Sequence, residues 1–153
     1  MSLNKNELMK PNELRIGNYL EMLGKVRKIE CISNLPARKE MYWLTCENMI
    51  DTKIIHFSPI LLTEKWLLKF GFEKIVYDSE ETGYGTDYHI KCDDDVFMSY
   101  TDDFSLGLYA SKDRMKNDLG VIPFWGNTKT VHGLQNIYFA LTGEELTYEN
   151  QTK

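Results

Sequence analysis

The sequence predicts an α+β fold with two small antiparallel β subdomains, a short linking helix and a C-terminal covering helix. The chain of 153 residues is 42% hydrophobic and 27% charged, which is typical of a globular protein and excludes a mainly disordered chain. Short segments rich in β-branched and aromatic residues alternate with turn signals along most of the length. Two further segments place apolar residues at helical spacing. Because a half-apolar sheet needs a cover, we expect the last helix to pack on the strands.

A single domain is expected over residues 14–146, after a flexible polar arm at 1–13 and before a tail at 147–153. Its first part, residues 14–62, contains four or five short strands with turns about every ten residues, which fits an SH3-like barrel or a curled sheet. Gly24 marks a tight hairpin between the first two strands, because glycine adopts the left-handed conformation that such turns need.

A second pair of strands is predicted at Glu40 to Ile50 and Lys53 to Phe57, with the turn over Asn48 to Thr52. The linking helix follows at residues 63–71. Thr63 is expected to cap its start, and Gly71 is expected to end it in a Schellman motif. Since few of its residues are polar, we expect this helix to be mostly buried.

Residues 72–146 are expected to form a β-meander followed by the covering helix. Pro123 places the last strand at an edge or a bulge, because proline cannot donate a ladder hydrogen bond. Thr130 is a good N-cap for the helix, and Gly143 suits its C-terminal end. An apolar stripe on this helix is expected to face the sheet, and it comprises Val131, Leu134, Tyr138 and Leu141.

Charge and cysteine content limit the possible settings. The net charge of −5 argues against a molecule that coats nucleic acid, although residues 1–45 carry eight Lys/Arg against five Asp/Glu. No signal peptide or membrane-spanning run is visible, so a cytoplasmic protein without a membrane contact is expected. The three cysteines, Cys31, Cys46 and Cys92, share no metal-binding spacing and are expected to be reduced and buried.

One flank of the last helix is the most suggestive surface. His132, Gln135, Asn136 and Phe139 lie at i, i+3, i+4 and i+7, beside the apolar stripe. An imidazole and two amides suit recognition of a base, a peptide or a backbone, and His132 is the one candidate for acid–base work. The alternative is a flank tied to its own sheet by hydrogen bonds, which is the commoner use of side-chain amides.

Two weaker candidate surfaces remain. Trp125 lies in a glycine-flanked turn, where it can anchor a partner or plug the end of the sheet. A small basic rim is the weak case for nucleic acid, and it comprises Lys25, Arg27, Lys28, Arg38 and Lys39. The acidic runs around residues 93–95 and 102–103 lack the ligand pattern of a calcium loop, so we expect no metal site and no cofactor.

Three patches resemble, in order, a family of small uncharacterised proteins from Bacteroidetes and their phages and mobile elements. They are Leu14-Arg15-Ile16-Gly17-Asn18-Tyr19, then Leu62-Thr63-Glu64-Lys65-Trp66-Leu67-Leu68-Lys69-Phe70-Gly71-Phe72, then residues 131–146 from Val131 to Leu146. At Gly133 the chain departs from the family, which usually carries a larger polar residue there. The resemblance implies a bacterial or phage setting and no assigned activity.

Because no catalytic constellation is visible, we expect a non-enzymatic binding or adaptor protein of a phage or mobile element that acts on a protein partner through an edge strand or the His132 flank. One alternative is a protein that binds or sequesters a small nucleotide-like signal molecule. A nucleic-acid-associated module is a further alternative. A homo-oligomer is also compatible with the sequence.

Overall fold

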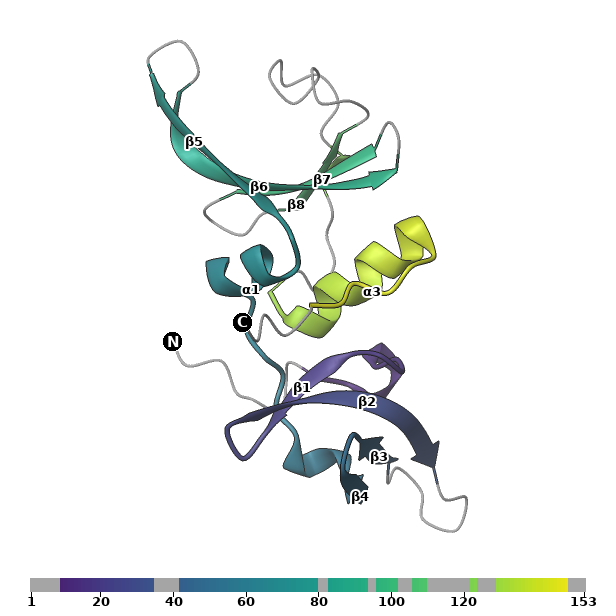
Figure 1. Ribbon diagram of the computed structural model, residues 1–153. Coiled ribbons are helices and arrows are strands. Elements are labelled where there is room, and N and C mark those ends of the chain that lie inside the picture. Colours follow the sequence, from purple (N-terminus) through teal and green to yellow (C-terminus); the bar gives the residue numbers. More distant parts are fainter. Residues whose placement is uncertain are drawn as a thin grey trace. The chain divides into compact units, whose positions relative to one another are not determined.

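The structure is a computed structural model that describes residues 9–34, 42–79, 83–93, 96–101, 106–109, 122–123 and 129–148. The chain divides into two compact units (Figure 1). Unit 1 comprises Met1–Leu61 and Thr130–Asn136, and unit 2 comprises Leu62–Lys129 and Ile137–Lys153. Each unit contains one antiparallel sheet together with helical segments, so the predicted α+β class is confirmed.

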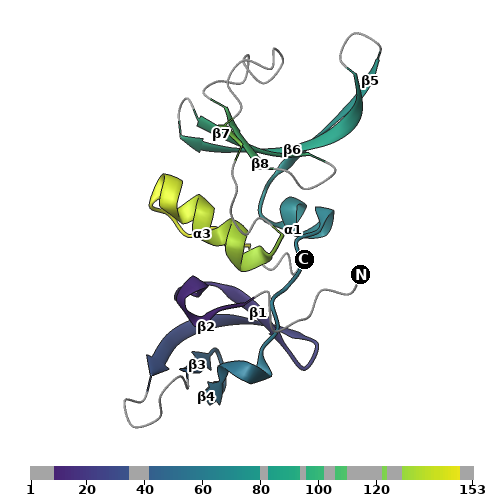
Figure 2. The same ribbon diagram turned by 180° about the vertical axis from the view of Figure 1, so that it is seen from behind.

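Unit 1 contains a four-stranded antiparallel sheet in the order β1-β2-β3-β4 (Figures 1 and 2). The strands are β1 (Tyr19–Met22), β2 (Lys25–Asn34), β3 (Tyr42–Cys46) and β4 (Met49–Lys53). The predicted hairpin at Gly24 is confirmed, because Leu23 and Gly24 both have positive φ, as a two-residue hairpin turn requires. The second hairpin turns earlier than predicted, at Glu47–Asn48, where Asn48 has a φ of 61°.

Two short 3₁₀ helices correct the predicted ends of this unit. The first, η1 (Pro11–Glu13), lies in the segment predicted to be a flexible arm. The second, η2 (Ile54–His56), replaces the strand predicted from Lys53 to Phe57. After η2 the chain returns beside β1, where Glu21 and Ser58 exchange two backbone hydrogen bonds of 2.9 and 2.8 Å. The choice between the two predicted forms of this sheet, an SH3-like barrel or a curled sheet, stays a prediction.

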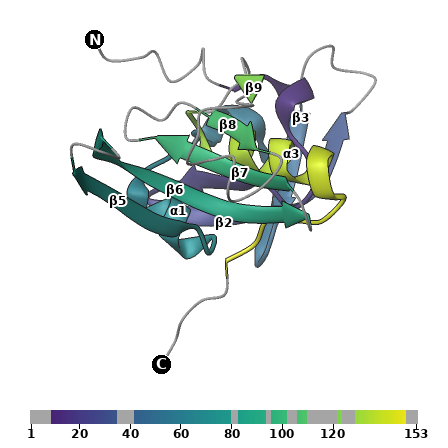
Figure 3. The same cartoon turned by 90° about the horizontal axis from the view of Figure 1, so that it is seen from above.

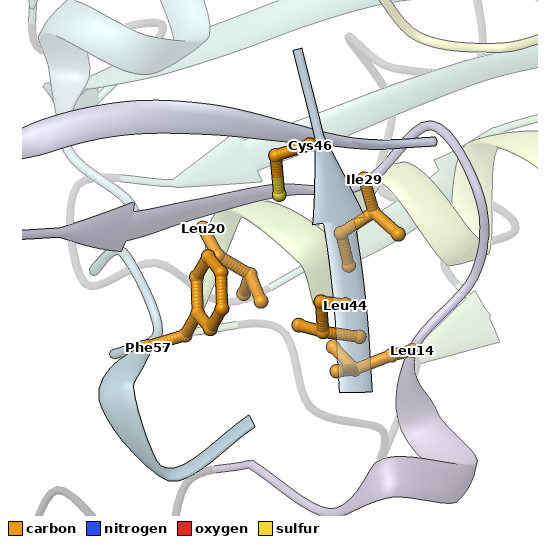
Figure 4. Close-up of a cluster of buried hydrophobic side chains, with 6 residues drawn as sticks. All are labelled: Leu14, Leu20, Ile29, Leu44, Cys46 and Phe57. Carbon is orange, nitrogen blue, oxygen red and sulfur yellow. The ribbon is translucent and has the colours of Figure 1, made fainter. Parts of the chain in front are cut away.

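The core of unit 1 lies between the sheet and the chain segments at its two ends (Figure 4). Leu20 on β1, Ile29 on β2 and Leu44 on β3 have no exposed surface. Leu14 and Phe57 complete the cluster from the segments before β1 and after η2, together with Cys46. The segment around η2 therefore belongs to the core through Phe57, while the neighbouring Ile55 is 77% exposed.

Unit 2 contains a five-stranded antiparallel meander in the order β5-β6-β7-β8-β9 (Figure 3). The strands are β5 (Glu73–Ser79), β6 (Gly83–Asp93), β7 (Val96–Thr101), β8 (Leu106–Tyr109) and β9 (Ile122–Pro123). This order confirms the predicted meander and places the strand with Pro123 at an edge. One face of the sheet supplies much of the core of unit 2, through Tyr88, Met98, Tyr100 and Leu106.

Helix α1 (Glu64–Lys69) begins and ends where the sequence predicts. The predicted Schellman motif at its C-terminal end is confirmed: Gly71 has a φ of 87°, and the amides of Phe72 and Gly71 donate to the carbonyls of Leu67 and Leu68, respectively. Two other details differ from the prediction. At the start, Thr63 accepts the first helical hydrogen bonds through its backbone carbonyl, and its side chain makes no cap. Leu68 is 46% exposed, so the helix is less buried than expected.

Helix α3 (Val131–Thr142) also begins and ends as predicted. The Thr130 hydroxyl accepts the Gly133 amide at 3.2 Å, and the Gly143 amide donates to the Phe139 carbonyl at 2.8 Å. The buried stripe differs at its C-terminal end, because Leu141 is 41% exposed. After the helix, the Tyr148 ring packs edge-on against Trp66 at 5.3 Å, so the start of the predicted tail belongs to unit 2.

Candidate functional site

The predicted flank of α3 is not an exposed surface at its N-terminal half. His132 and Gln135 have no exposed surface, and Asn136 and Phe139 are half-buried. His132 and Gln135 therefore do not present their side chains to solvent. Any binding role for Asn136 and Phe139 stays a prediction.

The cause of this burial is a turn before β1 that packs on the first turns of α3. The amide of Asn18 donates to the carbonyl of Arg15 at 3.2 Å, and Gly17, the third residue of this turn, has a φ of 94°. Only glycine adopts that conformation without steric cost, which explains the glycine of the Arg-Ile-Gly-Asn patch. The Asn18 side chain also accepts the Arg15 amide at 2.8 Å, which fixes the turn further.

Three side-chain amides, from Asn18, Gln135 and Asn136, join this turn to α3, and we call them the amide clasp. Gln135 accepts the backbone amide of Tyr19 at 2.9 Å and donates to the carbonyl of Gly17 at 3.1 Å. Asn136 accepts from the Asn18 side chain at 3.0 Å and donates to the carbonyl of Glu13 at 2.6 Å. The first and last of the three patches that carry the family resemblance are thus in direct contact, and the clasp amides are used for tertiary structure.

His132 does not have the environment of an acid–base catalyst. Its Nε2 lies 3.4 Å from the Thr130 hydroxyl, and its buried Nδ1 has no hydrogen-bond partner among the described residues. Burial lowers the pKa of His132 from 6.5 to about 4, because the charged imidazolium loses its hydration. The ring is therefore neutral at neutral pH and is shielded from any solvent-borne substrate.

The predicted basic rim does not form one surface in the part of the chain that the structure describes. Arg27 lies opposite Leu20 and shares its face of the β1–β2 ribbon, whereas Lys28 lies opposite Tyr19 on the other face. Lys25 and Lys28 are exposed, and Arg27 is half-buried with its Nε shielded from solvent. Arg38, Lys39 and Trp125 lie outside the described residues, as do the acidic residues 94–95 and 102–103. The described arrangement therefore gives no support to a nucleic-acid face.

One polar cluster in unit 2 was missed at the sequence level. Asp87 and His89 lie on the same face of β6, with 3.6 Å between the Asp87 carboxylate and His89 Nε2, and Ser99 lies opposite His89 on β7. Only the strand register reveals this grouping, because ten residues separate His89 from Ser99. The residue types match those of a hydrolase triad, but His89 is 5% and Ser99 1% exposed, so no substrate reaches them from solvent. We assign the cluster no catalysis.

The three cysteines lie among the described residues, where their environment can be compared with that of a metal ligand. No group of three or more potential metal ligands occurs among the described residues. Cys46 is buried and Cys92 is half-buried, and burial raises the pKa of both thiols, that of Cys92 to about 11. Cys31 is exposed, which corrects the expectation that all three thiols are buried.

Sheet edges are the remaining candidate surface, and they differ in how well they are protected. The outer side of β1 is covered locally by Ser58. Strand β4 is short and adjoins a register shift in β3, and β9 has two residues, one of them a proline. Strand β5 has seven residues, pairs with β6 without a register shift, and has no strand on its outer side within the described ranges. Natural proteins usually block such an edge, so β5 is the candidate functional site.

The side chains of β5 also favour contact with a partner. Val76 is 62% exposed at the centre of the strand. Its neighbours Ile75 and Tyr77, which point to the opposite face, are half-buried. Lys74 forms a 2.7 Å ion pair with Glu64 of α1, which lowers the pKa of the carboxyl and raises the pKa of the amine. An added strand would therefore meet apolar side chains on both faces.

Comparison with known proteins adds no identification: no protein-family model, curated protein or solved structure matches the chain. The resemblance to Bacteroidetes and phage proteins accordingly stays an expectation. None of the described helices is long and apolar enough to cross a membrane.

Proposed function

We propose that the chain is a non-enzymatic binding or adaptor protein that pairs its β5 edge with an extended segment of a protein partner. The observation that carries the proposal is the length and regularity of this edge, together with the absence of a strand on its outer side in the described residues. In strand addition the backbone supplies hydrogen bonds, and side chains that alternate between the two faces supply selectivity. The setting expected from the resemblance, a phage or mobile element, is part of this proposal.

The reactive side chains that the structure groups with other polar residues are not open to solvent. The imidazoles of His132 and His89 and the hydroxyl of Ser99 are buried, whereas the exposed His56 and Cys31 belong to no cluster of three or more potential metal ligands among the described residues. Strand β5 has instead no strand on its outer side in the described residues, and it exposes Val76 between charged and half-buried neighbours. This combination suits recognition of a backbone in extended conformation.

Strand addition can be tested with peptides selected from a random display library on the immobilised full chain. We expect selected peptides to be rich in β-forming residues and to bind the wild-type protein. Val76→Lys should weaken their binding, because it replaces the exposed apolar side chain at the centre of the strand with a second lysine. Leu68→Lys is the matched control, since it adds the same charge at another exposed apolar position of unit 2. Selected peptides that bind Val76→Lys as well as the wild type would contradict the proposal.

A further inference from the structure

We infer that the partner strand at the β5 edge is β5 of a second copy of this chain, paired antiparallel about Val76. This inference rests on the proposed function, because it assigns an occupant to the same edge. Its basis is that residues 74–78 are complementary to themselves when one copy is reversed against the other.

The antiparallel register centred on Val76 places complementary side chains opposite each other at residues 74–78, and it places Glu73 opposite Ser79. Lys74 falls opposite Asp78 of the second copy, and by symmetry Asp78 falls opposite Lys74. Ile75 falls opposite Tyr77, which pairs a β-branched side chain with an aromatic one, and Val76 falls opposite itself. Opposite charges and aromatic–β-branched pairs are the cross-strand combinations that stabilise antiparallel strands.

Neighbouring symmetric registers lack this match. A shift of the centre to Ile75 places Lys74 opposite Val76, and a shift to Tyr77 places Val76 opposite Asp78. Either change puts a charge against the exposed valine and removes the pairing of opposite charges. The sequence of β5 therefore favours the register centred on Val76 over its two symmetric neighbours.

The fold of unit 2 is compatible with this pairing. A two-fold axis perpendicular to the sheet keeps equivalent faces together, so the two meanders would form one continuous sheet. Lys74 already binds Glu64 of its own α1, but an ammonium has three donors and can bind a second carboxylate. The other end of the sheet is the two-residue strand β9, whose proline opposes further addition. This asymmetry favours a closed dimer over an open fibre.

The test is sedimentation velocity of the full chain over a concentration series, with charge-reversed variants. Lys74→Asp and Asp78→Lys each place two pairs of like charges in the dimer, and each should weaken self-association by roughly tenfold or more. The double variant restores both pairs and should restore the dimer. An equimolar mixture of the two single variants should form heterodimers, because every charged pair is then of opposite sign. Glu64→Gln is the control for loss of the ion pair with Lys74, and it should leave the dimer intact.

The same samples separate failure of this inference from failure of the proposed function. A wild-type chain that stays monomeric but binds selected peptides at β5 overturns self-pairing and leaves strand addition standing. A monomer that binds no peptide overturns both. A dimer that is insensitive to both single reversals, or a mixture that forms no heterodimer, shows that another surface associates and also overturns the inference.

Discussion

Removal of the Gln135 side chain should destabilise the protein substantially, because it is the central member of the amide clasp. Gln135 has no exposed surface, and its amide satisfies one backbone donor and one backbone acceptor. In Gln135→Ala the Tyr19 amide and the Gly17 carbonyl would be left buried without these partners. Each unsatisfied buried group costs about 1–3 kcal/mol, so the expected loss in free energy of unfolding for the two groups is about 2–6 kcal/mol.

Chemical denaturation followed by circular dichroism measures this loss, and amide hydrogen exchange localises it. We expect the Tyr19 amide to lose protection together with the turn before β1. Glu144→Ala, at an exposed position just beyond the same helix, should change the stability by less than about 0.5 kcal/mol. A Gln135→Ala protein as stable as this control would refute the claim that the clasp holds α3 to the first sheet.

Two further changes test other parts of the α3 environment. Leu134→Ala should lower the free energy of unfolding by about 2–5 kcal/mol, because Leu134 has no exposed surface. Leu141→Ala should lower it clearly less, because Leu141 is 41% exposed. Equal losses for the two variants in urea denaturation would contradict the packing described for α3. Since the folded-state pKa of His132 is about 4 and its unperturbed value is 6.5, the unfolded chain binds the proton more readily and stability should fall as the pH drops from 6.5 to about 4. The stability lost through protonation of His132 approaches about 3 kcal/mol below that range. His132→Leu should remove this loss when the free energies of unfolding at pH 7 and pH 4 are compared. An unchanged pH dependence in this variant would show that other groups cause the loss.

Local signals in the sequence were sufficient for much of the fold. The hairpin at Gly24 and the ends of α1 and α3 depend on residues that favour particular backbone conformations, and these conformations occur in the structure. The strand predicted over Lys53 to Phe57 failed for a non-local reason. Its run of β-branched residues favours a strand, but the chain turns there so that Phe57 enters the core and Ser58 reaches β1.

The candidate sites show the same division between local and long-range information. Helical spacing placed His132, Gln135 and Asn136 on neighbouring positions, but it carried no information about which segment covers them. That segment leads into the start of β1 and lies 116 to 123 residues away from its clasp partners in the sequence. Likewise, the β5 edge became visible only through the strand order, because the sequence of a strand does not reveal whether it has one neighbour or two.

The most direct test of the central claim is amide hydrogen exchange of the full chain at low and at high protein concentration. If β5 pairs with a second copy, alternate amides of residues 73–79 should gain protection as the concentration rises, while amides of the edge strand β4 should not. A strand β5 whose exchange is independent of both protein concentration and added selected peptide would contradict the account.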